Sequence, residues 1–119
     1  MTQIVGIGAA PGRAQGTVRW VRTAKDLGEF QPGEVLLAKM TSPDWAEVFQ
    51  KAAAVATEQG GMLCHAGIVA REEGIPAVVG VGPTLQELSD GDRVVVDGDD
   101  GSVTRMTGKG PQTDKSLEA

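Results

Sequence analysis

One short stretch of the sequence, TEQGGMLCHAGIVAR over 57–71, combines residue types that suit phosphoryl transfer. His65, the only histidine in the chain, follows two adjacent glycines, Gly60 and Gly61. Glycines leave backbone N–H groups free to converge on an anion, and the helix predicted to begin at His65 adds unpaired N–H groups and its positive dipole end. Since an imidazole is a nucleophile near neutral pH, the pattern predicts that His65 accepts a phosphoryl group.

Other roles for these residues stay open on spacing alone. A histidine that only caps or fills the turn is the more common outcome at such a position. A Cys64–His65 nucleophilic pair is disfavoured, because sequence neighbours at a loop-to-helix junction usually point in different directions. The chain has no second Cys or His for a structural zinc site. An EF-hand calcium loop counted from Asp97 would need Glu at position 108, which is glycine, so a hairpin turn is predicted there. We therefore predict no metal site in this chain.

Helix and strand signals place His65 at the end of a strand–loop–helix unit. Ala53–Thr57 is predicted as a strand, the glycine-containing loop covers 58–64, and a helix runs from His65 to Glu73 with Gly74 just after its end. Elsewhere we predict strands over 17–21, 34–38, 77–81, 93–97 and 102–106, a loop over 8–16, a short helix over 84–88, and a helix over 43–51 that is capped by Ser42 and buries Trp45, Val48 and Phe49. The expected fold class is α/β, with a small sheet system against a few short helices.

Length and charge restrict what the chain does. Its 119 residues form one domain, too small for a nucleotide pocket and an acceptor pocket together, so chemistry must involve partners. The 11 Lys and Arg against 16 Asp and Glu give a net charge of −5, which disfavours nucleic-acid binding. We expect no membrane span and, with a single cysteine, a cytoplasmic location. The domain is assigned to 1–106, and the polar tail 107–119 is expected to be disordered.

The run TEQGGMLCHAGIVAREEGIPAVVG resembles the phosphohistidine motif of the phosphoenolpyruvate (PEP)-utilising enzymes. These include pyruvate phosphate dikinase, PEP synthase, rifampicin phosphotransferase and enzyme I of the sugar phosphotransferase system. The resemblance extends through GEVLLAKMTSPDW, DGDRVVVDGDDGSV and the opening GIGAAPGRAQGTV, and so covers about 4–106. It implies a compact swivelling β/β/α domain in which the residue matching His65 carries the phosphoryl group. In these enzymes the domain moves between an ATP-grasp nucleotide site and a PEP/pyruvate or other acceptor site.

The resemblance also implies partners and site residues. ATP and its Mg²⁺ would be bound by an ATP-grasp partner domain, and this chain would bind no cofactor itself. Four residues around His65 match the family pattern: Thr57, Gly60, Gly61 and Arg71. Cys64 stands at a position where Ser or Cys is usual. Thr57 is expected to offer its hydroxyl to the imidazole or the phosphate. Arg71, about 120° around the helix from His65, either contacts the phosphate or guides docking.

Two positions depart from the family pattern. Leu63 stands where threonine is common, and Gly67 where Ala, Ser or Thr is expected. Leu63 is expected to cover the imidazole or to pack against a docking surface. Its presence keeps a second function open, that of a non-catalytic regulatory or interaction module with the same fold. The intact His65 favours instead a phosphocarrier component of a phosphotransferase, inactive as an isolated chain.

Overall fold

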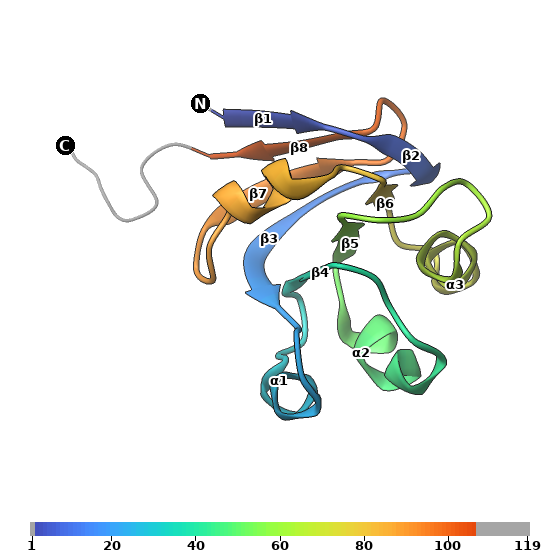
Figure 1. Cartoon of the computed structure of the whole chain (residues 1–119), viewed down its shortest axis with the longest axis vertical. Helices are drawn as coiled ribbons and strands as arrows, with labels where there is room; N and C mark the ends of the chain where they lie inside the picture. The colour runs from blue at the N-terminus through green and yellow to red at the C-terminus, as the bar shows by residue number, and fades with distance from the viewer. Residues whose placement is uncertain (1, 107–119) are drawn as a thin grey trace, which may run out of the picture.

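Eight strands and three α-helices make up the part of the chain that the computed structural model describes, residues 2–106 (Figure 1). The strands are β1 (Thr2–Val5), β2 (Ile7–Ala10), β3 (Arg13–Trp20), β4 (Val35–Ala38), β5 (Ala54–Thr57), β6 (Ala77–Val79), β7 (Arg93–Asp97) and β8 (Ser102–Arg105). The helices are α1 (Ala24–Glu29), α2 (Ala46–Lys51) and α3 (His65–Glu73), with 3-10 turns η1 (Pro43–Trp45) and η2 (Pro83–Glu87). The predicted tail over 107–119 lies outside the described residues.

The long strand β3 connects two halves of the sheet, whose order is β1-β8-β7-β3-β4-β5-β6-β2. Its first part, Arg13–Thr17, pairs antiparallel with β7, and its last part, Val18–Trp20, pairs parallel with β4. Strands β4, β5 and β6 continue the parallel half, which β2 closes in antiparallel fashion. Figure 1 shows β1, β7 and β8 on one side of β4 and β5, and α2 and α3 on the other.

Burial on both faces explains why β4, VLLA, is a continuous apolar run and why β5, AVAT, is apolar up to the buried Thr57 at its end. Val35 and Leu37 of β4 belong to a core that also contains Val94 of β7. Leu36, between them, belongs to a second core with Phe49 of α2 and with α3. A strand covered on both sides carries apolar side chains at nearly every position. The resulting layers, two of sheet and one of helices, confirm the predicted α/β fold class and β/β/α arrangement.

The N-terminal region differs from its prediction. The segment 8–16 is not a loop, because β2 covers Ile7–Ala10 and β3 begins at Arg13 instead of residue 17. Helix α1 was absent from the prediction. It has six residues, buries none of them, and depends on a capping box in which Thr23 and Asp26 satisfy each other's backbone N–H groups. A helix without an apolar face leaves no periodic signal in the sequence.

Most other elements agree with the sequence to within one or two residues. Helix α3 has the predicted bounds, and Gly74 follows it in the left-handed conformation with a φ of 76°. Helix α2 begins only after η1, and the expected side-chain cap is missing because the Ser42 hydroxyl donates to Asp44 at 3.1 Å. Trp45 is half-buried, and the helix predicted over 84–88 is the 3-10 turn η2. None of the helices within residues 2–106 is long and apolar enough to cross a bilayer.

Glycines in β2 and in the β7–β8 turn allow two backbones to cross at close range. A Cβ atom on Gly8 would overlap the carbonyl oxygen of Gly98, and a Cβ atom on Gly98 would overlap that of Ala10. Across the same crossing, the N–H of Gly98 donates to the carbonyl oxygen of Gly12 at 2.8 Å. Glycines in a sequence are typical both of a loop and of a strand that another backbone approaches closely. The loop predicted over 8–16 is wrong for this reason.

This crossing yields a stability prediction. Gly98→Ala forces backbone apart in a packed region, so we expect the free energy of unfolding to fall by about 3 kcal/mol. Gly28→Ala is the matched control, because a Cβ atom on Gly28 in α1 meets nothing within 4 Å. Replacing glycine in a helix by alanine stabilises by about 0.5–1 kcal/mol. Urea unfolding measures the free energy of unfolding of each variant. Equal free energies in Gly98→Ala and Gly28→Ala would contradict the close approach of the two backbones.

Candidate phosphoryl-transfer site

His65 lies at the carboxyl edge of the parallel strands. The loop over 58–64 leads from the end of β5 to His65, the first residue of α3, and Thr41 follows three residues after the end of the neighbouring β4. Ligand sites of α/β folds gather at this edge, because the loops after adjacent parallel strands meet there. The fold therefore brings together residues 24 positions apart in the sequence.

Two contacts fix the imidazole ring of His65. The Thr41 hydroxyl oxygen lies 2.7 Å from Nδ1, within hydrogen-bond distance. The Phe49 ring of α2 meets the imidazole edge-to-face, with ring centroids 5.8 Å apart and an interplanar angle of 83°. When Nδ1 carries the proton and donates to Thr41, Nε2 holds the lone pair of the neutral ring. The arrangement thus orients a half-buried imidazole, and in the Nδ1–H tautomer the lone pair is on Nε2.

A cavity of about 200 Å³ lies beside this ring. It is lined by residues from the ends of β4 and β5 and from the start of α3, namely Met40, Thr41, Thr57, Gln59, Gly60, Cys64, His65 and Ala66. Besides His65, three of the site residues predicted from the sequence line this cavity: Thr57, Gly60 and Cys64. Across residues 2–106, no three His, Cys, Asp or Glu side chains converge as a metal site.

The two loop glycines differ in their surroundings. Gly60 has a φ of +123°, and a Cβ atom there would lie 2.8 Å from Sγ of Cys64. Gly61 has no such constraint, and a Cβ atom on it would meet nothing within 4 Å. The carbonyl oxygen of Gly61 accepts the N–H of Cys64 at 3.1 Å, which turns the chain into α3. Gly60 is thus needed for the shape of the loop, whereas Gly61 leaves one side of the loop open.

Thr57 stabilises the loop from inside. It is fully buried, and its hydroxyl donates to the carbonyl oxygen of Gln59 at 2.6 Å. The Thr57 hydroxyl therefore does not donate to the imidazole in this structure, and its expected role toward the phosphate stays a prediction. The hydroxyl at the imidazole comes from Thr41. Thr41 lies in the segment GEVLLAKMTSPDW, which resembles the family, but the sequence alone gives it no role. Its position after a buried parallel strand was the available signal.

Arg71 holds the loop in place through two backbone carbonyls. One guanidinium nitrogen, Nη1, donates to the carbonyl oxygen of Ala9, and Nη2 donates to that of Met62 at 3.3 Å. Ala9 lies where the pairing of β2 with β6 is irregular. Its carbonyl oxygen accepts a hydrogen bond from the Arg71 side chain. The two expected roles of Arg71, phosphate contact and docking, both stay predictions. The observed contacts tie α3 and the loop to β2.

Gly67 belongs to the same packing arrangement. A Cβ atom on it would lie 2.9 Å from Cβ of Ala9 and 3.1 Å from the carbonyl oxygen of Met62. Helix α3 thus approaches β2 closely because Gly67 has no side chain. The departure from the family pattern at this position has a structural reason in this chain.

The contacts of Arg71 predict how its variants behave. Arg71→Lys keeps the charge but cannot bridge two carbonyls in a fixed fork, so we expect it to resemble Arg71→Met. Both should speed amide exchange at Cys64, whose N–H closes the loop, and should slow phosphoryl transfer about tenfold through misplacement of His65. Glu72→Gln, an exposed neighbour, is the control. Full activity in Arg71→Lys with loss in Arg71→Met would mean that the positive charge acts on phosphate.

Leu63 does not cover the imidazole. Its side chain is 81% exposed and does not line the cavity, so the first of the two expectations for Leu63 is wrong. Met40, Met62 and Ile68 are further exposed apolar side chains from the segments around His65. The second expectation, packing against a docking surface, stays a prediction.

Known proteins similar to this chain carry the same domain within larger molecules. Residues 30–101 match the family model of the PEP-utilising enzyme mobile domain. The chain is 48% identical over 101 residues to an uncharacterized phosphotransferase of Bacillus subtilis, covering 85% of this chain and 12% of the relative. It is 45% identical over 98 residues to a probable PEP synthase of Archaeoglobus fulgidus, covering 82% of this chain and 13% of the relative. The chain thus spans about an eighth of the length of these two relatives.

Solved structures similar to this chain support the match to the PEP-utilising enzyme mobile domain. The solution structure of the Enzyme I protein nEIt superimposes with a TM-score of 0.57 at 33% identity, over 66% of this chain and 33% of that one. Aconitase X of Thermococcus kodakaraensis has a TM-score of 0.68 at 18% identity over 89% of this chain and 99% of that one, a likeness of fold alone. The family match covers more than half of the described residues and includes both Thr41 and His65. This chain therefore belongs to the family of PEP-utilising enzyme mobile domains.

Proposed function

We propose that this chain is a phosphocarrier in which His65 accepts a phosphoryl group and passes it on. The observation that carries the proposal is the 2.7 Å contact between Thr41 Oγ1 and Nδ1 of His65, because it orients the ring and, with the proton on Nδ1, makes Nε2 the nucleophile. The donor site is an ATP-grasp nucleotide domain, which binds ATP with its Mg²⁺. The second site is a PEP/pyruvate or other acceptor domain. The length of the relatives supports the need for such further domains.

The transfer consists of two displacements at phosphorus. In the first, the Nε2 lone pair attacks, the N–P bond forms, and the bond from phosphorus to the donor oxygen breaks with its electron pair on that oxygen. In the second, an acceptor oxygen attacks phosphorus, and the N–P electron pair returns to Nε2. Positive charge develops on the imidazole during the first step. Thr41, which accepts a hydrogen bond from Nδ1–H, stabilises that charge.

Phosphoryl groups lie near the start of α3 in this proposal. The N–H groups of the first helical turn have no partners within the helix, and their dipoles favour an anion. Gly60 is exposed and Gly61 is half-buried, and a Cβ atom on Gly61 would meet nothing within 4 Å, so the approach to the loop is open. Both features support a phosphate held by backbone donors next to Nε2. The cytoplasmic location expected from the sequence is part of the same proposal.

The function is tested by a two-stage transfer. We expect the pure chain to consume neither ATP nor PEP, because it holds neither partner site. With a purified ATP-grasp domain and labelled ATP it should acquire an acid-labile, base-stable label. After repurification, the label should leave when a PEP/pyruvate domain and pyruvate are added. A chain that serves only as a regulatory or interaction module stays unlabelled at the first stage, which would overturn the proposal.

Thr41 provides a further test as a positioning residue. Thr41→Val loses a hydrogen bond to a developing charge, worth about 1.5 kcal/mol, so labelling should slow at least about tenfold, whereas Thr41→Ser should retain the rate. The ¹⁵N shifts of the His65 ring give an independent readout, because the Nδ1–H tautomer should lose population in Thr41→Val and keep it in Thr41→Ser. Ser42→Ala is the control, since the Ser42 hydroxyl donates to Asp44. An unchanged tautomer in Thr41→Val would contradict the assigned role.

A further inference from the structure

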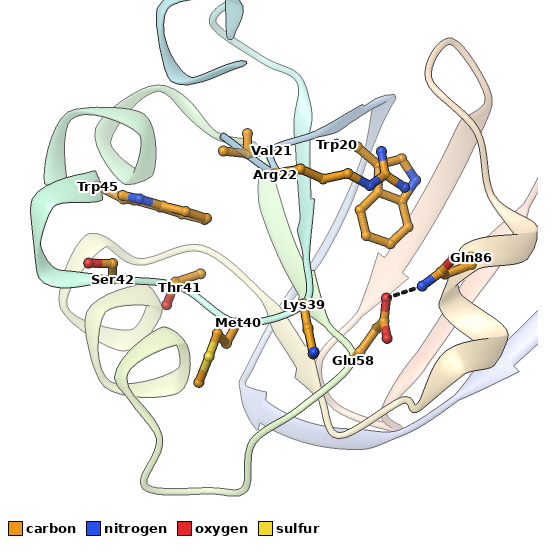
Figure 2. A pocket seen from close by; sticks show the side chains of 10 residues that line it. All are labelled: Trp20, Val21, Arg22, Lys39, Met40, Thr41, Ser42, Trp45, Glu58 and Gln86. Carbon is orange, nitrogen blue, oxygen red and sulfur yellow. Dashed lines mark hydrogen bonds between the residues drawn. The ribbon is translucent and has the colours of Figure 1, made fainter. Parts of the chain in front are cut away.

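A second, larger cavity adjoins the cavity beside His65. Its volume is about 430 Å³, and Met40 and Thr41 line both cavities. Figure 2 shows its wall, which runs from Trp45 and Ser42 on one side to Trp20, Arg22 and Glu58 on the other. Because the Thr41 hydroxyl faces Nδ1 of His65, the larger cavity lies on the Nδ1 side of the ring and away from Nε2. A molecule bound there is beside the path of phosphoryl transfer and not in it.

Two positive side chains at this cavity are available to an acidic partner. Arg22 and Lys39 are exposed, and neither forms an ion pair with a carboxylate within residues 2–106. The guanidinium of Arg22 lies 4.3 Å from the centre of the Trp20 ring, and a stacked guanidinium keeps its N–H edges directed outward. Glu58, the single acid among the described lining residues, accepts a hydrogen bond from the Gln86 amide at 2.9 Å. Two positive charges thus stand against one negative charge here, in a chain whose net charge is −5.

Aromatic and apolar surface is the other property of the cavity. Both tryptophans of the chain line it. Trp20 is buried and anchored, because its indole N–H donates to the carbonyl oxygen of Leu88 at 2.8 Å. Trp45 is half-buried and projects its indole toward the cavity (Figure 2), and Met40 is 58% exposed. Trp, Arg and Met are enriched where proteins bind proteins, so this lining favours a protein segment over a small anion, which would leave the indole uncovered.

We propose that this cavity is a docking pocket for the domain that donates the phosphoryl group, and that it receives an acidic segment of that domain. A large apolar side chain of the segment packs against Trp45 and Met40. A carboxylate next to that side chain pairs with Arg22 and Lys39. The inference rests on the proposed function for the identity of the partner. In that function the donor meets His65 without a phosphoryl group and leaves when His65 carries one.

The charge gained at His65 is the reason to assign this pocket to the donor and not to the acceptor. Phosphorylation adds about two negative charges next to the cavity, and these repel an acidic segment. The repulsion acts over about 10 Å at moderate salt. An acidic segment therefore binds the unmodified chain more tightly than the phosphorylated chain. This preference helps the donor to arrive before the transfer and to leave after it, whereas an acceptor needs the opposite preference.

Nuclear magnetic resonance of the ¹⁵N-labelled chain tests the docking pocket. The titrant is a purified ATP-grasp domain without nucleotide, so that no transfer occurs. The two indole N–H signals come from Trp20 and Trp45, so each reports on this cavity. We expect both signals to shift saturably, and the chain phosphorylated beforehand to bind about threefold more weakly at low salt. Binding that leaves both indole signals unmoved, or that is equal or tighter for the phosphorylated chain, overturns the proposal.

Matched variants test the pocket in the transfer reaction itself. Lys39→Glu and Trp45→Ala should each raise the concentration of donor domain that gives half the maximal labelling rate about tenfold, while Trp45→Phe retains the original value. The maximal rate should stay unchanged, because neither residue lines the cavity beside His65. Lys51→Glu is the control, since Lys51 is exposed and lines neither cavity. An equal increase in Lys51→Glu, or a loss of maximal rate alone in Lys39→Glu, would overturn the pocket.

Failure of the docking pocket is distinguishable from failure of the phosphocarrier proposal. His65→Ala should bind the ATP-grasp domain as the unmodified chain does, because His65 does not line the larger cavity. Normal labelling of His65 at every donor concentration in Lys39→Glu and Trp45→Ala would retain the carrier function and overturn the pocket. Saturable indole shifts in a chain that the donor never labels would overturn the carrier function and retain a pocket for an acidic segment.

Discussion

His65→Ala is expected to remove phosphorylation of the chain completely. His65 is the only histidine, its ring is oriented by Thr41, and it begins the helix whose N-terminus faces the loop. In the presence of an ATP-grasp partner and labelled ATP, the unmodified chain should gain one phosphoryl group by intact mass, and His65→Ala none. Phosphorus–nitrogen coupling in the NMR spectrum should place that group on Nε2.

His65→Asn is the matched variant for this experiment. An asparagine amide is able to hydrogen-bond with Thr41 near the position of Nδ1, but it offers no nucleophilic nitrogen. It should therefore keep the hydrogen bond and remain unlabelled, which separates loss of the nucleophile from loss of packing against Phe49. A label that persists in either variant would assign the phosphoryl group to another residue. Labelling on Nδ1 would contradict the role of Thr41.

The local signals that predicted the strand–loop–helix unit around His65 were sufficient because each has one physical meaning. Glycine after a helix satisfies the left-handed cap, as Gly74 does, and a run such as AVAT fits a strand that is covered on both faces. The family motif then placed the phosphoryl chemistry on His65. Agreement between these levels made the prediction of the unit accurate, since both the α3 bounds and the β5 strand follow from short-range sequence.

What the sequence did not predict depends on contacts between distant segments. Gly8 and Gly98 are 90 residues apart, and only the folded chain brings one against the backbone of the other. The motif does not predict the hydrogen bonds of Arg71 to the carbonyl oxygens of Ala9 and Met62, which depend on how α3 packs against β2. Thr41 reaches His65 through the parallel pairing of β4 with β5. Periodicity within one element contains none of this information.

The two loop glycines should respond to substitution in opposite ways. Gly60→Ala puts a side chain at a φ of +123° and against Cys64, the residue before His65. Strain of this kind costs about 1–3 kcal/mol, so we expect the free energy of unfolding to fall by that amount. Because the strain displaces the start of α3, His65 labelling should slow about a hundredfold. Urea unfolding and initial labelling rates measure the two effects.

Gly61→Val should leave the free energy of unfolding nearly unchanged, because its φ lies outside the left-handed region and its Cβ has open space. Labelling should nevertheless slow strongly in this variant, because the valine side chain blocks the approach of phosphate to the backbone of the loop. Gly61→Ala is the graded control, with a smaller side chain and a smaller loss. A Gly61→Val chain that is stable and is labelled at the normal rate would show that the loop only turns the chain. The oxygens of the phosphoryl group would then be held by the start of α3 and by the partner domain, and the backbone of the glycine loop would have no part in binding them.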